Sequence, residues 1–551
     1  MSAGTRGTRR TLGACAVVAA VLLSACAPDP GVVSISVAPA PVAPASDRPT
    51  ATTAPESPTT TTVTTTDDST STSAAPTTAP PPTLPPIVEP ELNTEIPLEN
   101  VVDVDASKPV RDYDAFLAVA LTDIDQWWSR VFPEVYGEPY VPLEGGVYAG
   151  YPERETALPG CGEPTTEYED LALFVAFYCE FGDFMVYDDD NQDVLAPLAD
   201  EFGAAVMGIV LAHEYGHAIQ ARIGALDRRL ATILTEQQAD CFAGAWTGQA
   251  YDGESELLRL GDADVRAGLI AMLSVRDPVG TSQFVPGGHG SAFDRVGAFQ
   301  VGFLEGPGRC AELLDEPLSL VPNQFQGGAD AILEGNAPYV CEDLRDLGFS
   351  EEQIANCTPA PEFLADDLND FWVTASGDTF PQLQVVPTDD LDAVVCDRPV
   401  RLADEVLVCA ETDTIAYDEP AVVDLYREFG DFTLGYFYGI AWAEVAQLNL
   451  GSTLTGEDRS LLNDCFTGAW VRDITPDANG RTARGQDTDG DGFQDTGISS
   501  SAGDLDEAIR MAILEGDDGA NVDEFGTAFE KIAALRIGAL GGLAACQAEL
   551  G

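Results

Sequence analysis

The chain has 551 residues, with 27 basic and 92 acidic side chains and a formal net charge of −65 at pH 7. Such an acidic chain repels phosphate backbones, which excludes nucleic acid as a partner. Because 45% of the residues are hydrophobic, packed cores are expected, and the length predicts two or three domains. The sequence contains only three histidines, His213, His217 and His289.

Residues 1–25 have the layout of a secretory signal peptide. Three arginines precede an apolar run over residues 12–23, which is too short to span a bilayer. The run ends in Leu-Ser-Ala-Cys26, which resembles a bacterial lipobox; the alternative is an ordinary signal peptide with an incidental cysteine. The lipobox predicts a lipoprotein with palmitate on Cys26, anchored at the extracytoplasmic face of a bacterial cell membrane.

Residues 26–105 are predicted to form a disordered stalk. The segment is dominated by Thr, Pro, Ser and Ala up to about residue 100, so it cannot form a hydrophobic core.

The remainder of the sequence contains a tandem duplication, since four blocks recur in the same order. It divides the chain into repeat one (residues 106–320), a connector (321–360) and repeat two (361–551). The clearest pairs of blocks are Glu201–Gly208 with Glu428–Gly435, Asp240–Trp246 with Asp464–Trp470, and Gly290–Val296 with Gly526–Ile532.

Equivalent cysteines of the two repeats should form equivalent disulfides, as expected outside the cell. Each repeat is predicted to be mostly helical with short strands near its first disulfide, which makes the fold class mainly α (α+β). In the connector, Ser350 and Gln353 predict a capping box that starts a short helix. The predicted pairs are Cys161 with Cys179, Cys396 with Cys409, Cys241 with Cys310, Cys465 with Cys546, and Cys341 with Cys357.

A helix is predicted from Glu201 to Ile223, ending at Gly224. Within it, His213 and His217 are four residues apart and share one face, so both imidazoles can bind one zinc ion. Glu214 is placed to orient and deprotonate a water that the metal activates. The alternative is a pair of histidines with a purely structural role.

A second helix is predicted to open at Glu236, which would be the third zinc ligand. Asp240 lies one turn further on and would hold a ligand imidazole through its other nitrogen. A solvated acidic helix face is the alternative interpretation of these two carboxylates.

Three pieces of repeat one, Ala212–His217, Glu236–Trp246 and His289–Arg295, resemble the bacterial neutral zinc metallopeptidase family, which is gluzincin-like. The resemblance implies a zincin-like fold, zinc on the two helix histidines and Glu236, and hydrolysis of peptide bonds. One departure is Ala218, where family members often carry a further histidine that is not a ligand.

His289 and Arg295 correspond to a third element of that family, a histidine followed six residues later by an arginine. A cation near the zinc would stabilise the oxyanion that forms when water attacks a peptide carbonyl. For His289, a catalytic role, an inhibitory role as a fourth ligand and a merely structural role all stay open.

Repeat two has lost the catalytic residues and is predicted to be a pseudo-enzyme domain. Asp464 and Lys531 remain at the positions of Asp240 and Arg295. The positions of His213, Glu214, His217, Glu236 and His289 are taken by Ile440, Ala441, Glu444, Ser460 and Phe525.

Repeat two also contains a candidate calcium loop. Its oxygen ligands would stand at positions 1, 3, 5 and 9, with Gly492 at the turn, whereas position 12 is Ile498 instead of glutamate. The alternative is a plain acidic loop. The four candidate ligands are Asp487, Asp489, Asp491 and Asp495.

The sequence thus predicts a membrane-anchored zinc endopeptidase that acts on a protein or peptide substrate. The competing hypothesis is a non-catalytic surface binding or assembly lipoprotein in which the zinc site is structural.

Overall fold

The computed structural model is mainly helical with small sheets, which confirms the predicted fold class at that level. No helix of the described part is long and apolar enough to cross a bilayer. The signal peptide, Cys26 and the four aspartates of the candidate calcium loop lie outside the described residues. The structure describes residues 32–36, 89–162, 164–166, 168, 174–190, 194–325, 328–376, 379–476, 481–485, 497–516 and 522–551.

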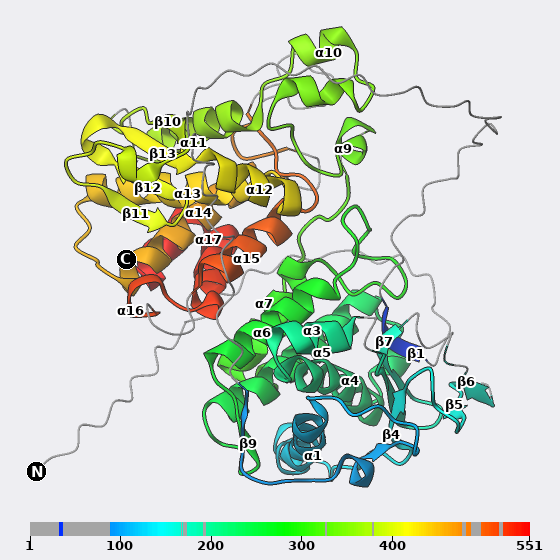
Figure 1. The fold of residues 1–551 in the computed structure, drawn as a ribbon. Coiled ribbons are helices and arrows are strands. Elements are labelled where there is room, and N and C mark those ends of the chain that lie inside the picture. Colours follow the sequence, from blue (N-terminus) through cyan, green and yellow to red (C-terminus); the bar gives the residue numbers. More distant parts are fainter. Residues whose placement is uncertain are drawn as a thin grey trace, which may run out of the picture. The chain divides into compact units, whose positions relative to one another are not determined.

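Repeat one combines a five-stranded sheet, in the order β1-β7-β8-β4-β3, with helices that carry most of its core (Figure 1). Its helices are α1 (Asp114–Tyr136), α3 (Leu195–Phe202), α4 (Ala205–Arg222), α5 (Thr232–Tyr251), α6 (Asp262–Ser274), α7 (Ala292–Glu305) and α8 (Pro307–Glu312), with a 3-10 turn at Leu226–Arg228. Its strands are β1 (Val32–Ser36), β3 (Val102–Asp103), β4 (Gly146–Gly150), β7 (Phe174–Cys179) and β8 (Phe184–Asp188), with short pairs β2 (Glu91–Leu92) with β9 (Leu258–Arg259) and β5 (Leu158–Pro159) with β6 (Thr165–Thr166).

Part of the range assigned to the stalk is folded against repeat one. Strand β1 pairs with β7, β2 pairs with β9, and β3 pairs with β4. Val102 of β3 is 2% exposed and belongs to the main core cluster. Residues 98–100 add a 3-10 turn, Leu98–Asn100. Regular structure therefore begins before the boundary predicted at residue 105.

The prediction of a single helix over residues 201–223 is wrong, because the helix is interrupted at Gly203. This glycine has φ of +104°, a conformation that a residue with a side chain rarely adopts, and it ends α3 before α4 begins. The C-terminal end of α4 agrees with the prediction, since Gly224 follows it with φ of +67°. The second predicted helix is α5, which begins at Thr232, one turn before Glu236.

The connector and repeat two follow. The predicted capping box is confirmed, since Ser350 caps α10 and its hydroxyl and backbone N–H both meet Gln353. The connector holds α9 (Gly328–Ile332), a 3-10 turn (Cys341–Arg345) and α10 (Glu351–Ala355). Repeat two holds helices α11 (Ala360–Ser376), α12 (Glu419–Phe429), α13 (Phe432–Leu450), α14 (Glu457–Ile474), α15 (Asp504–Glu515), α16 (Val522–Phe525) and α17 (Ala528–Glu549), strands β10 (Gln384–Thr388), β11 (Val400–Ala403), β12 (Val406–Cys409) and β13 (Thr414–Asp418), and 3-10 turns at Leu391–Ala393 and Ala410–Thr412.

The two repeats share strand pairings and buried hydrogen bonds. In repeat one β8 pairs parallel to β4 and antiparallel to β7, and in repeat two β13 pairs in the same way with β10 and β12. Trp246 of α5 donates to Asp123 of α1 at 2.9 Å, and Trp470 of α14 donates to Asp367 of α11 at 2.9 Å. Helices α4, α5 and α7 thus correspond to α13, α14 and α17.

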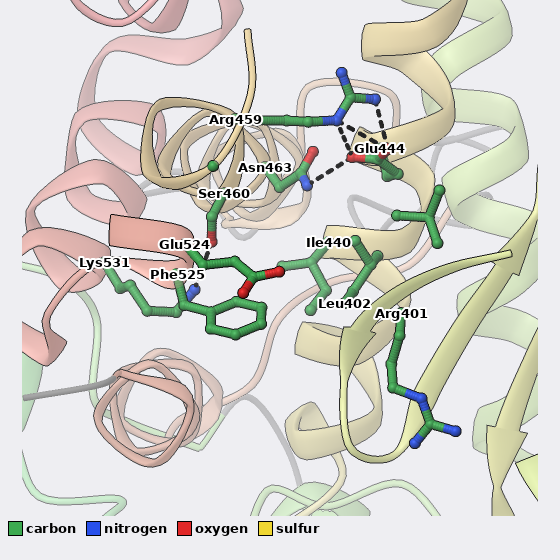
Figure 2. A pocket seen from close by; sticks show the side chains of 12 residues that line it. Arg401, Leu402, Ile440, Glu444, Arg459, Ser460, Asn463, Glu524, Phe525 and Lys531 are labelled. Carbon is green, nitrogen blue, oxygen red and sulfur yellow. Dashed lines mark hydrogen bonds and ion pairs between the residues drawn. The ribbon is translucent and has the colours of Figure 1, made fainter. Parts of the chain in front are cut away.

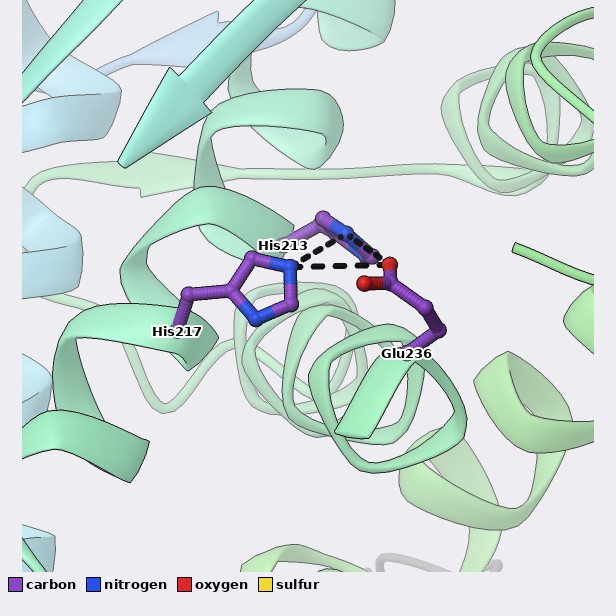
Figure 3. Close-up of side chains that lie close together, drawn as sticks. All are labelled: His213, His217 and Glu236. Carbon is purple, nitrogen blue, oxygen red and sulfur yellow. Dashed lines mark hydrogen bonds and ion pairs between the residues drawn. The ribbon is translucent and has the colours of Figure 1, made fainter. Parts of the chain in front are cut away.

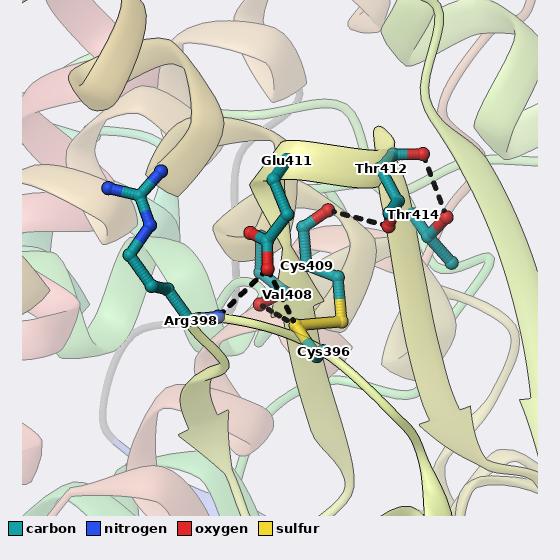
Figure 4. Close-up of a disulfide and its surroundings, with 7 residues drawn as sticks. All are labelled: Cys396, Arg398, Val408, Cys409, Glu411, Thr412 and Thr414. Atoms are coloured by element: carbon teal, nitrogen blue, oxygen red, sulfur yellow. Dashed lines mark hydrogen bonds between the residues drawn. A yellow bond between two sulfur atoms is a disulfide. The ribbon is translucent and has the colours of Figure 1, made fainter.

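The ten predicted disulfide cysteines form the five expected pairs. The bond from Cys396 to Cys409 fixes the end of β12 (Figure 4). Beside it, Glu411 accepts a hydrogen bond from the Arg398 backbone at 2.8 Å. In each repeat one disulfide also joins two helices: Cys241 of α5 to Cys310 of the short α8, and Cys465 of α14 to Cys546 of α17.

Candidate metal centre

Two closely packed helices of repeat one, α4 and α5, bring the predicted ligands together. A Cβ atom at Gly216 would lie 2.9 Å from the Cα of Ala239, so only glycine allows the two helix backbones to approach this closely. The approach places His213 and His217 of α4 opposite Glu236 of α5. The glycine between the histidines therefore has a direct part in assembling the centre.

Three side-chain atoms converge at this contact (Figure 3). The Nε2 atoms of His213 and His217 are 3.1 Å apart, and they lie 3.2 Å and 3.5 Å from Oε2 of Glu236. Ligand atoms about 2.0–2.1 Å from a tetrahedral zinc ion are about 3.3 Å from one another. The three residues are almost fully buried and can hold a metal ion.

The Nδ1 atom of each imidazole is held by a neighbouring side chain, and this orients Nε2 toward the site. His213 Nδ1 lies 2.6 Å from Oδ1 of Asp240, as the sequence predicts. His217 Nδ1 lies 3.0 Å from Oε1 of Gln220, whose amide donates in turn to the backbone oxygen of Thr235 at 2.7 Å. Burial lowers the pKa of His213, but the Asp240 carboxylate raises it to about 9, so this ring is a strong electron donor.

Gln220 has a role that the sequence analysis did not assign. It stands three residues after His217, and the equivalent Gln447 of repeat two also donates to a backbone oxygen, that of Arg459, at 2.8 Å. The sequence did offer a signal for this contact, because Gln220 stands one helical turn after a ligand histidine and side chains at that spacing can interact.

Arg295 of α7 lies against Asp240 and also approaches the ligand His213, whose Nδ1 is 3.5 Å from Nη2 of Arg295. Its Nη2 and Nε donate to the two Asp240 oxygens at 2.7 Å and 3.0 Å, and its Nη1 donates to the backbone oxygen of Val275 at 2.7 Å. Burial raises the pKa of Asp240, but Arg295 and His213 outweigh burial and hold it below its usual value. These contacts indicate a positioning role for Arg295, and its direct role at an oxyanion stays a prediction.

Replacing Arg295 should destabilise the chain and weaken the metal site together. In Arg295→Met the Asp240 carboxylate stays buried without its cation, which typically costs about 3–5 kcal/mol of unfolding free energy. Metal affinity should also fall by roughly 10–100-fold, because Asp240 no longer holds His213 firmly. Denaturant unfolding and a competitive zinc titration measure the two effects.

Repeat two supplies the matched control for Arg295. Lys531 donates to the buried Asp464 at 2.8 Å, so Lys531→Met should destabilise the fold but leave metal affinity unchanged. Arg295→Lys, which imitates repeat two, should recover part of both losses. Equal metal affinity in Arg295→Met and the parent protein would contradict the positioning role.

Glu214 is buried beside the three ligand atoms with no hydrogen-bond partner in the described part of the chain. Burial raises the pKa of its carboxyl, whereas the neighbouring His217 and His213 lower it. A carboxylate with free oxygens next to a metal site and a raised pKa is suited to take up and release a proton.

The structure also brings His289 to the centre, on the loop before α7. Its Nε2 lies 3.9 Å from Oε2 of Glu236, and its Nδ1 lies 3.6 Å from Oδ1 of Asp277. Asp277 is fixed in turn, because its Oδ2 accepts the backbone N–H of Gly290 at 2.9 Å. Asp277 was not singled out by sequence, since it lies 12 residues before His289 and has no motif of its own.

The equivalent place in repeat two contains a cavity of about 150 Å³ (Figure 2). Glu444, which takes the place of His217, is paired with Arg459 and accepts a hydrogen bond from Asn463 at 3.1 Å. No metal-ligand set appears there within the described residues. The cavity lining includes four of the five replacements, Ile440, Glu444, Ser460 and Phe525, and also Lys531.

The chain is similar to bacterial proteins that are named only as uncharacterized. It is 29% identical over 211 residues to the uncharacterized protein Rv2575 of Mycobacterium tuberculosis, an alignment that covers 33% of this chain and 64% of the relative, less than two thirds of its length. The uncharacterized protein YpfJ of Escherichia coli K12 is 29% identical over 220 residues, covering 35% of this chain and 69% of YpfJ. No family model and no solved structure matches the chain.

Proposed function

We propose that the protein is a zinc-dependent endopeptidase of the zincin type, anchored by lipid at the outer face of a bacterial cell membrane. The observation that carries the proposal is the buried Glu214 carboxylate beside three converging ligand atoms from His213, His217 and Glu236. Three protein ligands with an adjacent carboxylate are typical of catalytic zinc sites, whereas structural sites usually have four protein ligands.

Zinc suits these donors better than the common alternatives. Two imidazoles and one carboxylate favour zinc or a similar transition metal, whereas magnesium and calcium prefer oxygen ligands alone. The unpartnered oxygens of Glu236 also fit a group that binds a cation, because a buried carboxylate without one is costly.

A bound zinc ion would supply Lewis acidity toward a water molecule and the carbonyl of the scissile peptide bond. Glu214 accepts the proton of the attacking water and passes it to the leaving amine. Asp240 and Gln220 keep the two ligand rings in place, and Arg295 holds Asp240. His289 faces Asp277 through Nδ1 and Glu236 through Nε2, and in this proposal it donates a hydrogen bond to the developing oxyanion.

In this proposal repeat two is a degenerate copy without catalysis. Its retained framework supports a role in substrate docking or in covering repeat one. Direct contacts join the repeats: Arg276 pairs with Asp506 at 2.9 Å, and Gln300 donates to the backbone oxygen of Phe529 at 2.9 Å.

The extreme burial of the centre favours a second candidate function. His213, His217 and Glu214 are each 0% exposed, so a substrate has no access to the centre in this structure. The chain would then be a surface binding or assembly lipoprotein that zinc stabilises. Under the endopeptidase proposal, the substrate needs a movement that opens the site.

Chelation distinguishes the two functions. The purified protein, supplied with zinc, is incubated with casein and with a peptide library, and products are read by mass spectrometry. We expect internal peptide-bond cleavage that stops with a chelator and returns when zinc is restored. Zinc-dependent thermal stability without hydrolysis of any polypeptide would favour the binding function.

A further inference from the structure

A second group of buried acids lies in repeat two, far in sequence from the histidines. Asp431 caps the start of α13, Asp504 is the first residue of α15, and Glu507 stands in the first turn of α15. One carboxylate oxygen from each residue lies within 4.8 Å of those of the other two. We refer to these three residues as the acidic cluster.

Backbone amides hold each carboxylate of the acidic cluster in place through one oxygen. Asp431 Oδ2 accepts the N–H of Ala337 at 2.9 Å, and Asp504 Oδ2 accepts that of Ser501 at 2.8 Å. Glu507 Oε2 accepts the N–H of Phe432 at 2.8 Å. The three groups are therefore prearranged by the backbone, as ligands of a rigid site would be.

Two of the remaining oxygens have no hydrogen-bond partner. Oδ1 of Asp431 and Oδ1 of Asp504 are buried from solvent and accept no hydrogen bond from the described residues. The two residues are only 7% and 6% exposed. A buried carboxylate oxygen without a donor or a cation is costly, so these two oxygens indicate a ligand.

Several negatively charged side chains lie close together at the acidic cluster. Burial raises the pKa of Asp431 to about 7, and burial together with Asp431 raises that of Asp504. Asp330 of α9 adds a further negative charge that acts on both. Burial together with Asp431 raises the pKa of Glu507 well above its usual value, despite the opposing charge of Arg510, whose guanidinium lies over the ring of Phe429. Among the described residues, no ion pair joins a lysine or arginine to the acidic cluster.

We propose that the acidic cluster binds a hard divalent cation, calcium or magnesium. Carboxylate oxygens are the ligands that both ions prefer, and water and backbone carbonyls complete their coordination. The cluster is distinct from the His213 centre, which offers nitrogen ligands, and from the candidate calcium loop, whose four aspartates are other residues.

The cation would join the connector to repeat two beside the contact with repeat one. Through Ala337 and Asp330 the cluster adjoins the connector, since Asp330 accepts a hydrogen bond from Ser501 at 2.5 Å. Helix α15 also carries Asp506, which pairs with Arg276 of repeat one. Asp431 stands where repeat one has Ala204, so the site is an addition of repeat two.

The test uses the full chain, freed of divalent ions with a chelator and then reloaded with one equivalent of zinc. Calcium chloride and magnesium chloride are titrated separately, with Tm read by calorimetry and binding by isothermal titration. We expect one additional ion per chain and a rise of Tm with at least one of the two salts, and comparison of the two titrations identifies the ion.

Three variants locate the binding. The double variant Asp431→Asn/Asp504→Asn should lose both the rise of Tm and the binding of the cation. It should still fold, because asparagine keeps the backbone hydrogen bonds and the substitutions remove two repelling charges. Asp424→Asn, at an exposed site in α12, should keep both responses. The double variant Asp487→Asn/Asp489→Asn, in the candidate calcium loop, should also keep the rise of Tm and the binding. A response that survives in the first variant, or its absence from the parent protein with both salts, would overturn the proposal.

Discussion

Glu214→Gln should reduce the rate of peptide hydrolysis by roughly 10²–10⁴-fold, the usual contribution of a general acid–base group. Glutamine has nearly the same shape as glutamate but cannot accept the proton of the attacking water. Zinc content should stay the same, because Glu214 is not among the three converging ligand residues. Stability at neutral pH should not fall, since burial raises the pKa of Glu214 and the substitution removes a costly buried charge.

Glu201→Gln is the matched control for this prediction. Glu201 is exposed in α3, just before the break at Gly203, so its substitution should leave hydrolysis unchanged. Comparable rates in Glu214→Gln and the parent protein would show that Glu214 is not the base.

Glu236→Gln should remove zinc binding and hydrolysis together. The amide is a much weaker ligand than the carboxylate, and the two histidine nitrogens alone do not complete a zinc site. The stabilisation by zinc should disappear as well, an effect of about 4 kcal/mol when the free ion is at 1,000 times its dissociation constant. Metal analysis after dialysis and Tm with and without zinc measure these losses.

Glu254→Gln provides the comparison for Glu236→Gln. Glu254 is exposed and follows the same helix, α5, so this variant should bind zinc and keep its activity. If Glu236→Gln retained one zinc ion per chain at parental affinity, another residue would have to be the third ligand.

The central part of the site was predictable because its geometry is local. His213 and His217 are four residues apart on one helix, and so are Glu236 and Asp240, so the face that each pair shares follows from helical periodicity alone. That the two faces meet depends on the close approach at Gly216, which the sequence shows only as one more glycine.

The remaining features depend on tertiary packing. Arg295 was expected near the metal, and the structure places its guanidinium on Asp240 and 3.5 Å from Nδ1 of His213, a pairing that no residue spacing predicts. Asp277 acts through a contact that no residue spacing displays, whereas the spacing of Gln220 from His217 offered a signal that was not used. The acidic cluster brings Asp431 together with Asp504, which lies 73 positions later in the chain, so no sequence motif indicated the cluster.

The most direct test of the account is the rate of peptide cleavage as zinc is added to the metal-free protein. Activity should rise in proportion to bound zinc, reach its maximum at one ion on the His213 centre, and stay roughly 10²–10⁴-fold lower at every zinc level in Glu214→Gln. A protein that binds this zinc ion tightly but cleaves no peptide, or cleaves equally well in Glu214→Gln, would contradict it.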